Sequence, residues 1–398
     1  MRLFGPIIFS VAILTILTLV NLLLFKYIDK TWWRNDRVRR AVKITPFIGL
    51  GGIVLWITGY YTDLGSIATF GSVVAVLVVV LLTALIISIP FSAIFNRLSN
   101  RPKKTAESVA PKENIDNSRR RILKGTAAAF PLITLSAAGG GVAKSFLDTK
   151  IYSLPIGFKD LPKHLEGLRI LHLSDSHLGI YKHLDDYENI LRNTEKYNPD
   201  LVLITGDIAD DLNLLPEALK MAASIKPKYG AYASLGNHEY YRGITQVMNA
   251  FDNGPVELLR SSGKTLEIDG GRLYLAGCDD PVGMRRVEYG FLTDSIEKAL
   301  TGRSGDDFTI LMSHRPESFD PASEMNINLT LSGHTHGGQA GVNGRSLWSV
   351  FSDRYLWGEY EKNGARMYLS SGIGHWFPFR LGCPTEAPII ELTSKITT

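Results

Sequence analysis

Five short polar clusters between positions 174 and 338 combine carboxylate, amide and imidazole side chains that could bind metal ions or move protons. They read SDSHLG, GDIADD, GNHEYY, SHRPE and GHTHGG, and they begin at positions 174, 206, 236, 313 and 333. Five of the nine histidines lie in these clusters. Carboxylate oxygens and imidazole nitrogens together suit borderline divalent ions such as Mn, Fe or Zn. We therefore expect metal-assisted chemistry here.

The spacing within the clusters indicates which side chains act as ligands. Asp175 and His177 are two residues apart, so both face the same way on an extended strand end. Asp207 is the candidate to bridge two ions. A neutral amide oxygen and three imidazoles complete the donors, from Asn237, His314, His334 and His336. Two ions ~3.5–4 Å apart clamp a phosphoryl group and make a hydroxide nucleophile from bound water.

Each cluster directly follows a short apolar run that predicts a buried strand. These runs cover 168–174, 200–205, 230–236, 308–313 and 328–332. Helical patterns near 184–197 and 214–226 separate the first three runs, which is a β-α-β alternation. Further strands are predicted as a hairpin over 263–277 and as closing strands at 366–371 and 388–393. Ligand chemistry in open α/β sheets gathers beyond the carboxyl ends of strands, so the clusters should meet.

The five clusters, in this order, resemble the signature of the calcineurin-like metallophosphoesterases. The signature spans Asp175 to Gly338, and the similar domain runs from about Leu154 to Thr393. The extended GHTHGGQ and the ending SSGIGHWFPFRLGCPTEAPIIELT resemble a membrane-linked or exported bacterial branch, similar to the transmembrane protein with metallophosphoesterase domain. The resemblance implies an α/β catalytic domain with two mixed β-sheets sandwiched by helices.

The resemblance also implies a role for each residue of the site. It assigns the first metal to Asp175, His177, Asp207 and His336, and the second to the bridging Asp207 with Asn237, His314 and His334. His238 is then not a ligand, but faces the substrate and steadies the transition state or protonates the leaving oxygen. Asp210 would orient a ligand from behind.

Other residues near these clusters have roles that the sequence leaves open. Arg380 and His375 could touch a substrate phosphate or head group, or could form a surface or sheet-end pairing. Arg315 is expected at a helix start or in solvent, and Asp279 with Asp280 in a turn. An aromatic group is expected to pack, or to form an apolar rim at a membrane interface; it comprises Trp348, Phe351, Tyr355, Trp357 and Tyr360.

The first third of the chain has the composition of a membrane region. Residues 5–25 carry no charge, and further apolar runs cover 44–61 and 67–95. A helix of about 20 apolar residues spans a bilayer core, so residues 1–95 predict three transmembrane helices. Lys and Arg are abundant between the first two runs and after the third, whereas YYTDLGS has none. The positive-inside rule therefore places residues 96–124, a basic linker, in the cytoplasm.

A second apolar segment of different character covers residues 125–145. The preceding SRRRILK at 118–124 resembles the twin-arginine export motif, which would make the translocation machinery a partner; the alternative is a fourth ordinary span. Either interpretation carries residues 150–398, the metallophosphoesterase domain, to the extracytoplasmic face. The small residues in AAGGGVAKS would suit a signal peptidase, so cleavage there stays open.

Charge and cysteine content exclude several other classes. The 398 residues carry a net charge of +4, and the basic residues cluster beside the apolar runs, where anionic lipids and orientation explain them, so nucleic acid is not expected as a partner. Cys278 and Cys383 form no CxxC, which excludes a zinc ribbon or redox motif. Two buried free thiols are favoured over a disulfide.

These observations predict a membrane-anchored phosphoesterase with two divalent ions. A metal-bridged hydroxide would attack a phosphodiester or related phosphate ester of a lipid or cell-envelope molecule. One alternative is a UDP-2,3-diacylglucosamine pyrophosphatase of lipid A biosynthesis, an activity associated with relatives of the branch, which needs a cytoplasmic site. The other is a non-catalytic membrane sensor or scaffold, which the retention of all seven ligand positions and His238 argues against.

Overall fold

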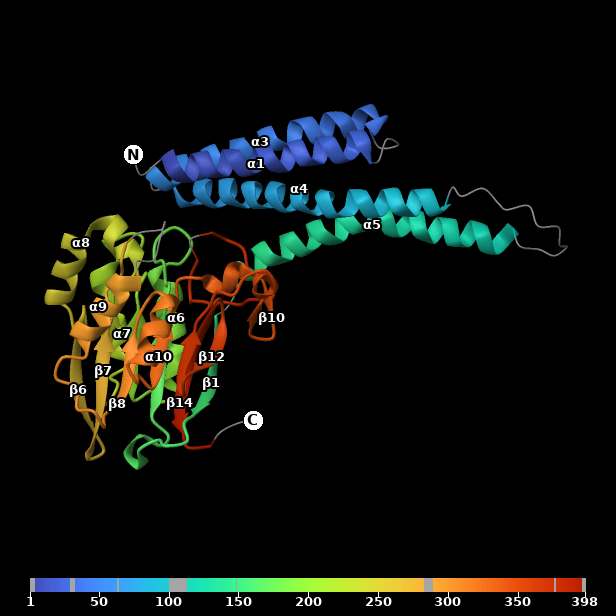
Figure 1. The fold of residues 1–398 in the computed structure, drawn as a ribbon. Helices are drawn as coiled ribbons and strands as arrows, with labels where there is room; N and C mark the ends of the chain where they lie inside the picture. Colours follow the sequence, from blue (N-terminus) through green and yellow to red (C-terminus); the bar gives the residue numbers. More distant parts are fainter. Residues whose placement is uncertain are drawn as a thin grey trace. The chain divides into compact units, whose positions relative to one another are not determined.

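The computed structural model describes residues 4–28, 33–62, 64–99, 113–147, 149–282, 289–375 and 377–395. Two compact units make up the chain, Met1–Ala143 and Lys144–Thr398 (Figure 1). Arg2, Lys30 and residues 100–112 of the predicted basic linker lie outside the described residues.

The first unit contains long apolar helices. Three of the described helices are long and apolar enough to cross a membrane by length and composition: α1 (Phe4–Tyr27), α3 (Asp36–Tyr61) and α4 (Gly65–Ser99). Glycines let α3 and α4 approach closely, because a Cβ on Gly71 would lie 2.3 Å from the backbone nitrogen of Trp56. Buried Asn21 of α1 donates to the carbonyl oxygen of Leu82 in α4 at 2.8 Å.

Helix α5 (Glu113–Ser145) begins earlier than the predicted apolar segment. The predicted basic linker covers residues 96–124, and the structure places its last part, residues 113–124, in this helix. The sequence from Glu113 to Lys124 contains no glycine or proline, so no residue in it interrupts a helix. Whether α5 crosses a membrane stays a prediction, because α1, α3 and α4 are the candidate spans among the described helices.

The second unit contains two six-stranded mixed sheets (Figure 1). In sheet order, the first comprises β1 (Lys150–Gly157), β14 (Glu386–Thr393), β2 (Arg169–Leu173), β3 (Leu201–Thr205), β4 (Ala231–Ser234) and β5 (Glu257–Leu258). The second comprises β12 (Gly358–Lys362), β13 (Ala365–Leu369), β9 (Leu329–Ser332), β8 (Phe308–Met312), β7 (Gly271–Gly277) and β6 (Ser262–Ile268). Strands β2 to β5 are parallel, and β14 is antiparallel to β2. Strands β7, β8, β9 and β13 are parallel, with antiparallel β6 and β12 at the edges.

The two sheets pack face to face, with helices on both outer faces. One core joins Ile170 and Leu203 of the first sheet to Ile310 of the second. Two further cores join each sheet to its own helices, which are α6 (Leu184–Glu195), α7 (Leu215–Ser224) and α8 (Asn237–Asp252) on the first, and α9 (Tyr289–Ala299) and α10 (Phe319–Glu324) on the second. This four-layer arrangement confirms the predicted two-sheet α/β fold.

Short elements complete the second unit. They are the 3₁₀ helices η1 (Lys163–Leu165), η2 (Pro316–Ser318), η3 (His336–Gln339) and η4 (Leu347–Val350), and the small hairpin of β10 (Gly341–Val342) and β11 (Arg345–Ser346). Cys278 and Cys383 are buried free thiols, as expected.

Candidate metal centre

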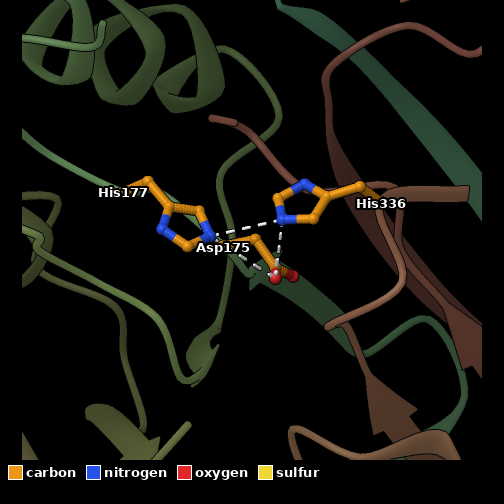
Figure 2. A group of neighbouring side chains, drawn as sticks. All are labelled: Asp175, His177 and His336. Carbon is orange, nitrogen blue, oxygen red and sulfur yellow. Dashed lines mark hydrogen bonds and ion pairs between the residues drawn. The ribbon is translucent and has the colours of Figure 1, made fainter. Parts of the chain in front are cut away.

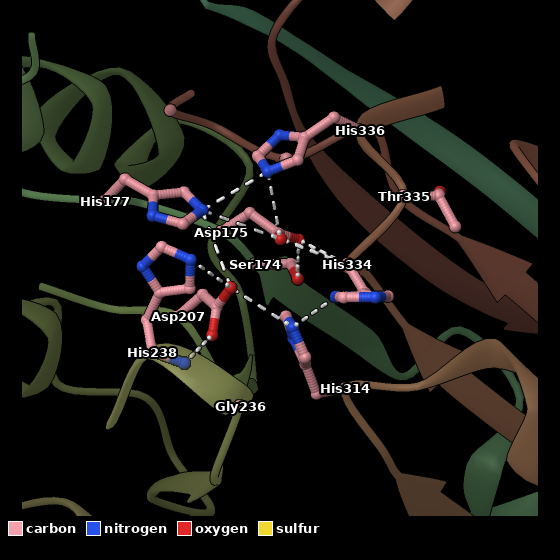
Figure 3. A network of polar contacts seen from close by, with 12 residues as sticks. Ser174, Asp175, His177, Asp207, Gly236, His238, His314, His334, Thr335 and His336 are labelled. Atoms are coloured by element: carbon pink, nitrogen blue, oxygen red, sulfur yellow. Dashed lines mark hydrogen bonds and ion pairs between the residues drawn. The ribbon is translucent and has the colours of Figure 1, made fainter. Parts of the chain in front are cut away.

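The polar clusters meet where the carboxyl ends of the two sheets come together. Strands β2, β3 and β4 of the first sheet lead into Asp175, Asp207 and Asn237. Strands β8 and β9 of the second lead into His314 and His334. The two sheets therefore supply opposite walls of one site, as Figure 3 shows.

The backbone is strained where it carries the ligands. Asp175, His177, Asp207, His334 and His336 all have positive φ angles, between 45° and 74°. Such left-handed conformations cost energy in non-glycine residues and gather at functional sites. Gly333 and Gly236 leave room for these turns. A Cβ on Gly333 would lie 2.1 Å from a carboxylate oxygen of Asp175, and one on Gly236 would lie 2.2 Å from a carboxylate oxygen of Asp207.

One group of donors comprises Asp175, His177 and His336, all buried (Figure 2). His336 Nε2 lies 3.4 Å from Asp175 Oδ1, and His177 Nε2 lies 4.0 Å from the same oxygen. The Nε2 atoms of the two histidines are 3.2 Å apart. Asp175 is held in turn by the backbone N–H of His334, which donates to its carboxylate at 3.0 Å.

A second group comprises Asp207, His314 and His334 (Figure 3). His314 Nε2 lies 3.2 Å from Asp207 Oδ2 and 3.2 Å from His334 Nδ1. Asp207 Oδ2 is also 3.6 Å from His177 Nε2 of the first group, so this carboxylate lies between the two groups.

The donor atoms fit cations. In each group, ring nitrogens and carboxylate oxygens point at one another within 4.8 Å, and a positive charge among them would offset the repulsion of their lone pairs. Asn237 Oδ1 is buried and has no hydrogen-bond partner among the described residues, which suits a neutral oxygen ligand. The residues present therefore fit divalent metal ions.

His238 and Asp210 form a hydrogen-bonded pair beside the donors. His238 Nδ1 lies 2.5 Å from Asp210 Oδ1, and its Nε2 lies 4.0 Å from Asp207 Oδ2. Burial opposes the charged form of His238, but the carboxylates of Asp207 and Asp210 raise its pKa to about 10. Asp210 Oδ2 is also 3.4 Å from His177 Nδ1, so Asp210 contacts the far side of a candidate ligand.

Glu239 is a supporting residue for which sequence reasoning gave no role. Its buried carboxylate accepts hydrogen bonds from the backbone N–H groups of Asp207, Ile208 and Gly236 at 2.8–2.9 Å. Burial and the nearby Asp207 raise its pKa. Glu239 thereby joins the loops after β3 and β4. The available signal in the sequence was the position of Glu239 in GNHE, because a glutamate two residues after a candidate ligand is expected to contact the site.

Arg315 stands at a helix start, as the N-cap residue of η2, but it is buried, so only the expectation of a solvent role is wrong. Its guanidinium contacts Asp280 at 2.7 Å and lies 2.8 Å from His334 Nε2. Asp280 is therefore more than a turn residue. Arg315 and Asp280 together support the ring of His334. Asp280 lies 35 residues before Arg315 in the sequence, so no local pattern connects the two residues.

Arg380 is also fully buried and lies behind His336. It donates to the carbonyl oxygens of Ser371 and Gly374 at 2.8 and 2.6 Å, and lies 3.0 Å from His336 Nδ1. This position corrects the suggestion that Arg380 touches a substrate phosphate, because the side chain is fully buried and both terminal nitrogens, Nη1 and Nη2, are bonded inside the protein. His375 is 1% exposed and stacks on Tyr181 at 5.5 Å, so direct substrate contact is not favoured for it either.

The aromatic group divides into two parts. Tyr355 and Tyr360 pack against each other at 4.9 Å, and buried Trp357 donates to Glu386 at 3.0 Å. Trp348 and Phe351 are instead 54% and 83% exposed. The expected packing role therefore applies only to Tyr355, Trp357 and Tyr360.

Comparison with known proteins matches residues 168–338 to the family described as calcineurin-like phosphoesterase. The matched residues include every candidate metal ligand. An uncharacterized metallophosphoesterase of Helicobacter pylori (strain J99 / ATCC 700824) is 31% identical over 283 residues, covering 70% of this chain and 73% of that protein.

Two further relatives differ in how much of their length is matched. An uncharacterized metallophosphoesterase of Aquifex aeolicus is 32% identical over 64% of this chain and 96% of its own length. The transmembrane protein with metallophosphoesterase domain of Danio rerio is 30% identical over 66% of this chain and 61% of its own length. The Aquifex protein shows that the matched region makes up nearly a whole protein.

Proposed function

This chain belongs to the calcineurin-like metallophosphoesterase family, and we propose that it hydrolyses a phosphodiester or related phosphate ester of a lipid or cell-envelope molecule. Family membership makes it a metal-dependent phosphoesterase. The observation that carries the proposal is the meeting of seven donors, six of them buried and His334 half-buried, at the joined ends of two sheets, in a chain whose described residues also include three apolar helices of membrane-spanning length.

We propose that the site binds two divalent ions. Asp175, His177 and His336 would hold one, Asn237, His314 and His334 the other, and Asp207 both. When bound, such ions polarise the phosphoryl oxygens and lower the pKa of the attacking water. Mn, Fe and Zn all suit this mixture of oxygen and nitrogen donors.

His238 is the residue placed to handle the leaving group. Its side chain is 16% exposed, against 3% or less for His177, His314 and His336. Asp210 holds Nδ1, which leaves Nε2 directed toward Asp207 and the donors. As the bond from phosphorus to the ester oxygen breaks, cationic His238 donates its Nε2 proton to that oxygen. A diester then yields an alcohol and a phosphate monoester.

Membrane anchoring through α1, α3 and α4 would keep the site near lipid substrates. We propose that α5 carries the domain to the extracytoplasmic face, by the twin-arginine machinery or as a fourth span. A metal-loaded domain favours the twin-arginine route, because that machinery passes folded cargo.

One observation favours a second candidate function. The candidate spans among the described helices are α1, α3 and α4, and α5 is not one of them. If α5 does not cross, the positive-inside rule leaves the domain in the cytoplasm. There the UDP-2,3-diacylglucosamine pyrophosphatase reaction becomes available. Protease protection of the domain in sealed membranes, inside-out and right-side-out, separates the two locations.

The first test of the proposal is hydrolysis of bis-p-nitrophenyl phosphate by the full chain with Mn²⁺. We expect turnover that Asp207→Asn and His238→Ala each reduce at least about a hundredfold, as general acid–base and metal-ligand losses do. Asp306→Asn is the matched control, because Asp306 is exposed and precedes β8, at the opposite end from His314. Equal rates in all four proteins would contradict the assigned site.

A further inference from the structure

A short surface segment of the second unit carries a group of exposed apolar side chains. It consists of residues 342–351, which we call the apolar tip, and includes β11 and η4. Exposed fractions are 57% for Val342, 47% for Leu347, 54% for Trp348, 81% for Val350 and 83% for Phe351. Such a concentration of exposed apolar surface marks an interaction site.

The apolar tip is attached directly to the segment that carries a candidate metal ligand. Trp348 Nε1 donates to the carbonyl oxygen of Gly338 at 2.9 Å, and Leu347 N donates to that of Ala340 at 2.9 Å. Gly338 and His336 both belong to η3. Whatever the tip binds is therefore held close to the metal centre.

The residues through which the chain enters the second unit are linked to the base of the apolar tip by a short series of contacts. Phe146 and Leu147 directly follow α5 and are 46% and 59% exposed. The ring of Phe146 packs edge-on against His375 at 5.7 Å. Two residues further on, the carbonyl oxygen of Phe377 accepts a hydrogen bond from Gln339 Nε2 at 2.9 Å. His375 and Phe377 thus link the entry point to the base of the apolar tip.

We propose that the apolar tip docks into the surface of a lipid bilayer. The chain's own apolar helices α1, α3 and α4 point to a membrane rather than a protein partner. Trp and Phe are the side chains that favour the bilayer interface. Arg345 within the tip and Arg354 just after it are exposed and form no ion pair within the part of the chain described, so they are available to anionic head groups.

Docking would define the substrate class of the site. With the tip in the interface, η3 and the metal centre lie at the head-group layer, so a phosphate ester in that layer reaches the site without leaving the bilayer. This consequence rests on the proposed function, whereas the docking itself does not need catalysis.

The docking is tested with the full chain reconstituted in vesicles of phosphatidylethanolamine and phosphatidylglycerol. A Val350→Cys variant carries a bimane label, and the native cysteines stay unlabelled because both are buried. We expect doxyl-labelled lipids to quench this label several-fold more than one on Asp306→Cys. Equal quenching at both positions overturns the proposal. A spectral shift at position 350 that depends on protein concentration, without lipid quenching, also overturns it and indicates a second copy instead.

A second measurement separates docking from catalysis. The Val350→Ser/Phe351→Ser variant should hydrolyse bis-p-nitrophenyl phosphate as fast as the wild type. It should hydrolyse hexadecyl p-nitrophenyl phosphate in the same vesicles about tenfold more slowly, because two inserted apolar side chains are lost. Equal slowing of both substrates, or of neither, overturns the role of the tip. If the wild type hydrolyses neither substrate, the proposed function fails while the quenching result still decides the docking.

Discussion

At the scale of single residues, the two histidines of GHTHGG each have a buried arginine behind the ring. Arg315 lies 2.8 Å from His334 Nε2, and Arg380 lies 3.0 Å from His336 Nδ1. A positive charge near a metal ligand disfavours cation binding, whereas a fixed ring orientation favours it. Arg380 also bonds three carbonyl oxygens, including that of His336, so we expect positioning to outweigh repulsion.

Replacing Arg380 distinguishes these two effects. We expect Arg380→Met to weaken Mn²⁺ binding about 10- to 100-fold, as the loss of a residue that supports a ligand does. Arg380→Lys keeps the charge but not the fork of donors, and should weaken binding as well. Isothermal titration with Mn²⁺ measures both. Arg272→Met is the control, because the half-exposed side chain of Arg272 pairs with Asp307, which directly precedes β8 at the end away from His314. Tighter binding by Arg380→Met would show that repulsion dominates.

His172 gives a prediction for the pH dependence of stability. The residue is fully buried, and desolvation lowers its pKa to about 3, against about 6.5 in the unfolded chain. Below pH 6.5 the unfolded state binds a proton that the folded state does not, so the free energy of unfolding decreases as the pH is lowered. From pH 7.5 to 5.5 this residue alone should cost about 1.4 kcal/mol.

The measurement is the free energy of unfolding of wild type and His172→Gln at both pH values. Glutamine can still bond Thr205, which lies 2.9 Å from His172 Nε2, but it does not titrate. Effects of the other histidines cancel in the comparison. Parallel pH dependence in the two proteins would exclude the assigned pKa.

The types and positions of the donor residues could be predicted from the sequence, whereas their supports could not. Asp175 and His177 lie in one short cluster directly after an apolar strand, which a local pattern records, but both have positive φ angles instead of the extended backbone expected from their spacing. Asp280 and Arg315 meet only because the segments after β7 and β8 lie side by side. Long side chains such as that of Arg380 also reach several partners, so spacing along the chain says little about their contacts.

At the scale of elements, strands with apolar runs were predicted to within two residues of each end, and strands without them were missed. Strand β12 alternates half-buried and exposed residues at a sheet edge, and β1 is the edge of the other sheet. Edge strands bury less surface and so show weaker apolar patterns. Helix α8 begins at Asn237, and its first turn was interpreted as part of a ligand cluster.

The close packing of α3 and α4 leads to a prediction with a matched pair of glycines. A Cβ on Gly71 would lie 2.3 Å from Trp56 N, whereas one on Gly51 meets no atom within 4 Å. Gly71→Ala should therefore separate the helices and lower the thermal midpoint of the first unit in detergent by several degrees. Gly51→Ala should leave it unchanged or raise it, because alanine favours helix. Equal midpoints for both variants would mean that α3 and α4 do not pack this closely.

At the scale of the whole molecule, the position of the export-like motif can be tested. Arg119 and Arg120 lie within α5 and follow the three candidate spans. If the twin-arginine machinery moves the domain, Arg119→Lys/Arg120→Lys should leave it on the cytoplasmic side, where protease added outside cannot reach it. An ordinary fourth span keeps its flanking positive charge in this variant and should cross unaffected. Crossing that is unchanged would therefore assign α5 as a span.

The division into two units leads to a last prediction, about the second unit alone. Residues 144–398 contain every candidate ligand and four apolar cores among the described residues, and the Aquifex relative is matched over 96% of its own length. We expect this fragment to fold and to hydrolyse bis-p-nitrophenyl phosphate within about threefold of the full chain, because chemistry depends on groups that it holds in place. Its rate on hexadecyl p-nitrophenyl phosphate in vesicles should fall much further, since tethering raises the effective concentration of the site at the bilayer. Steady-state rates on both substrates measure this difference. A fragment that loses both activities equally would mean that the first unit supports the metal centre itself, rather than bringing it to the substrate.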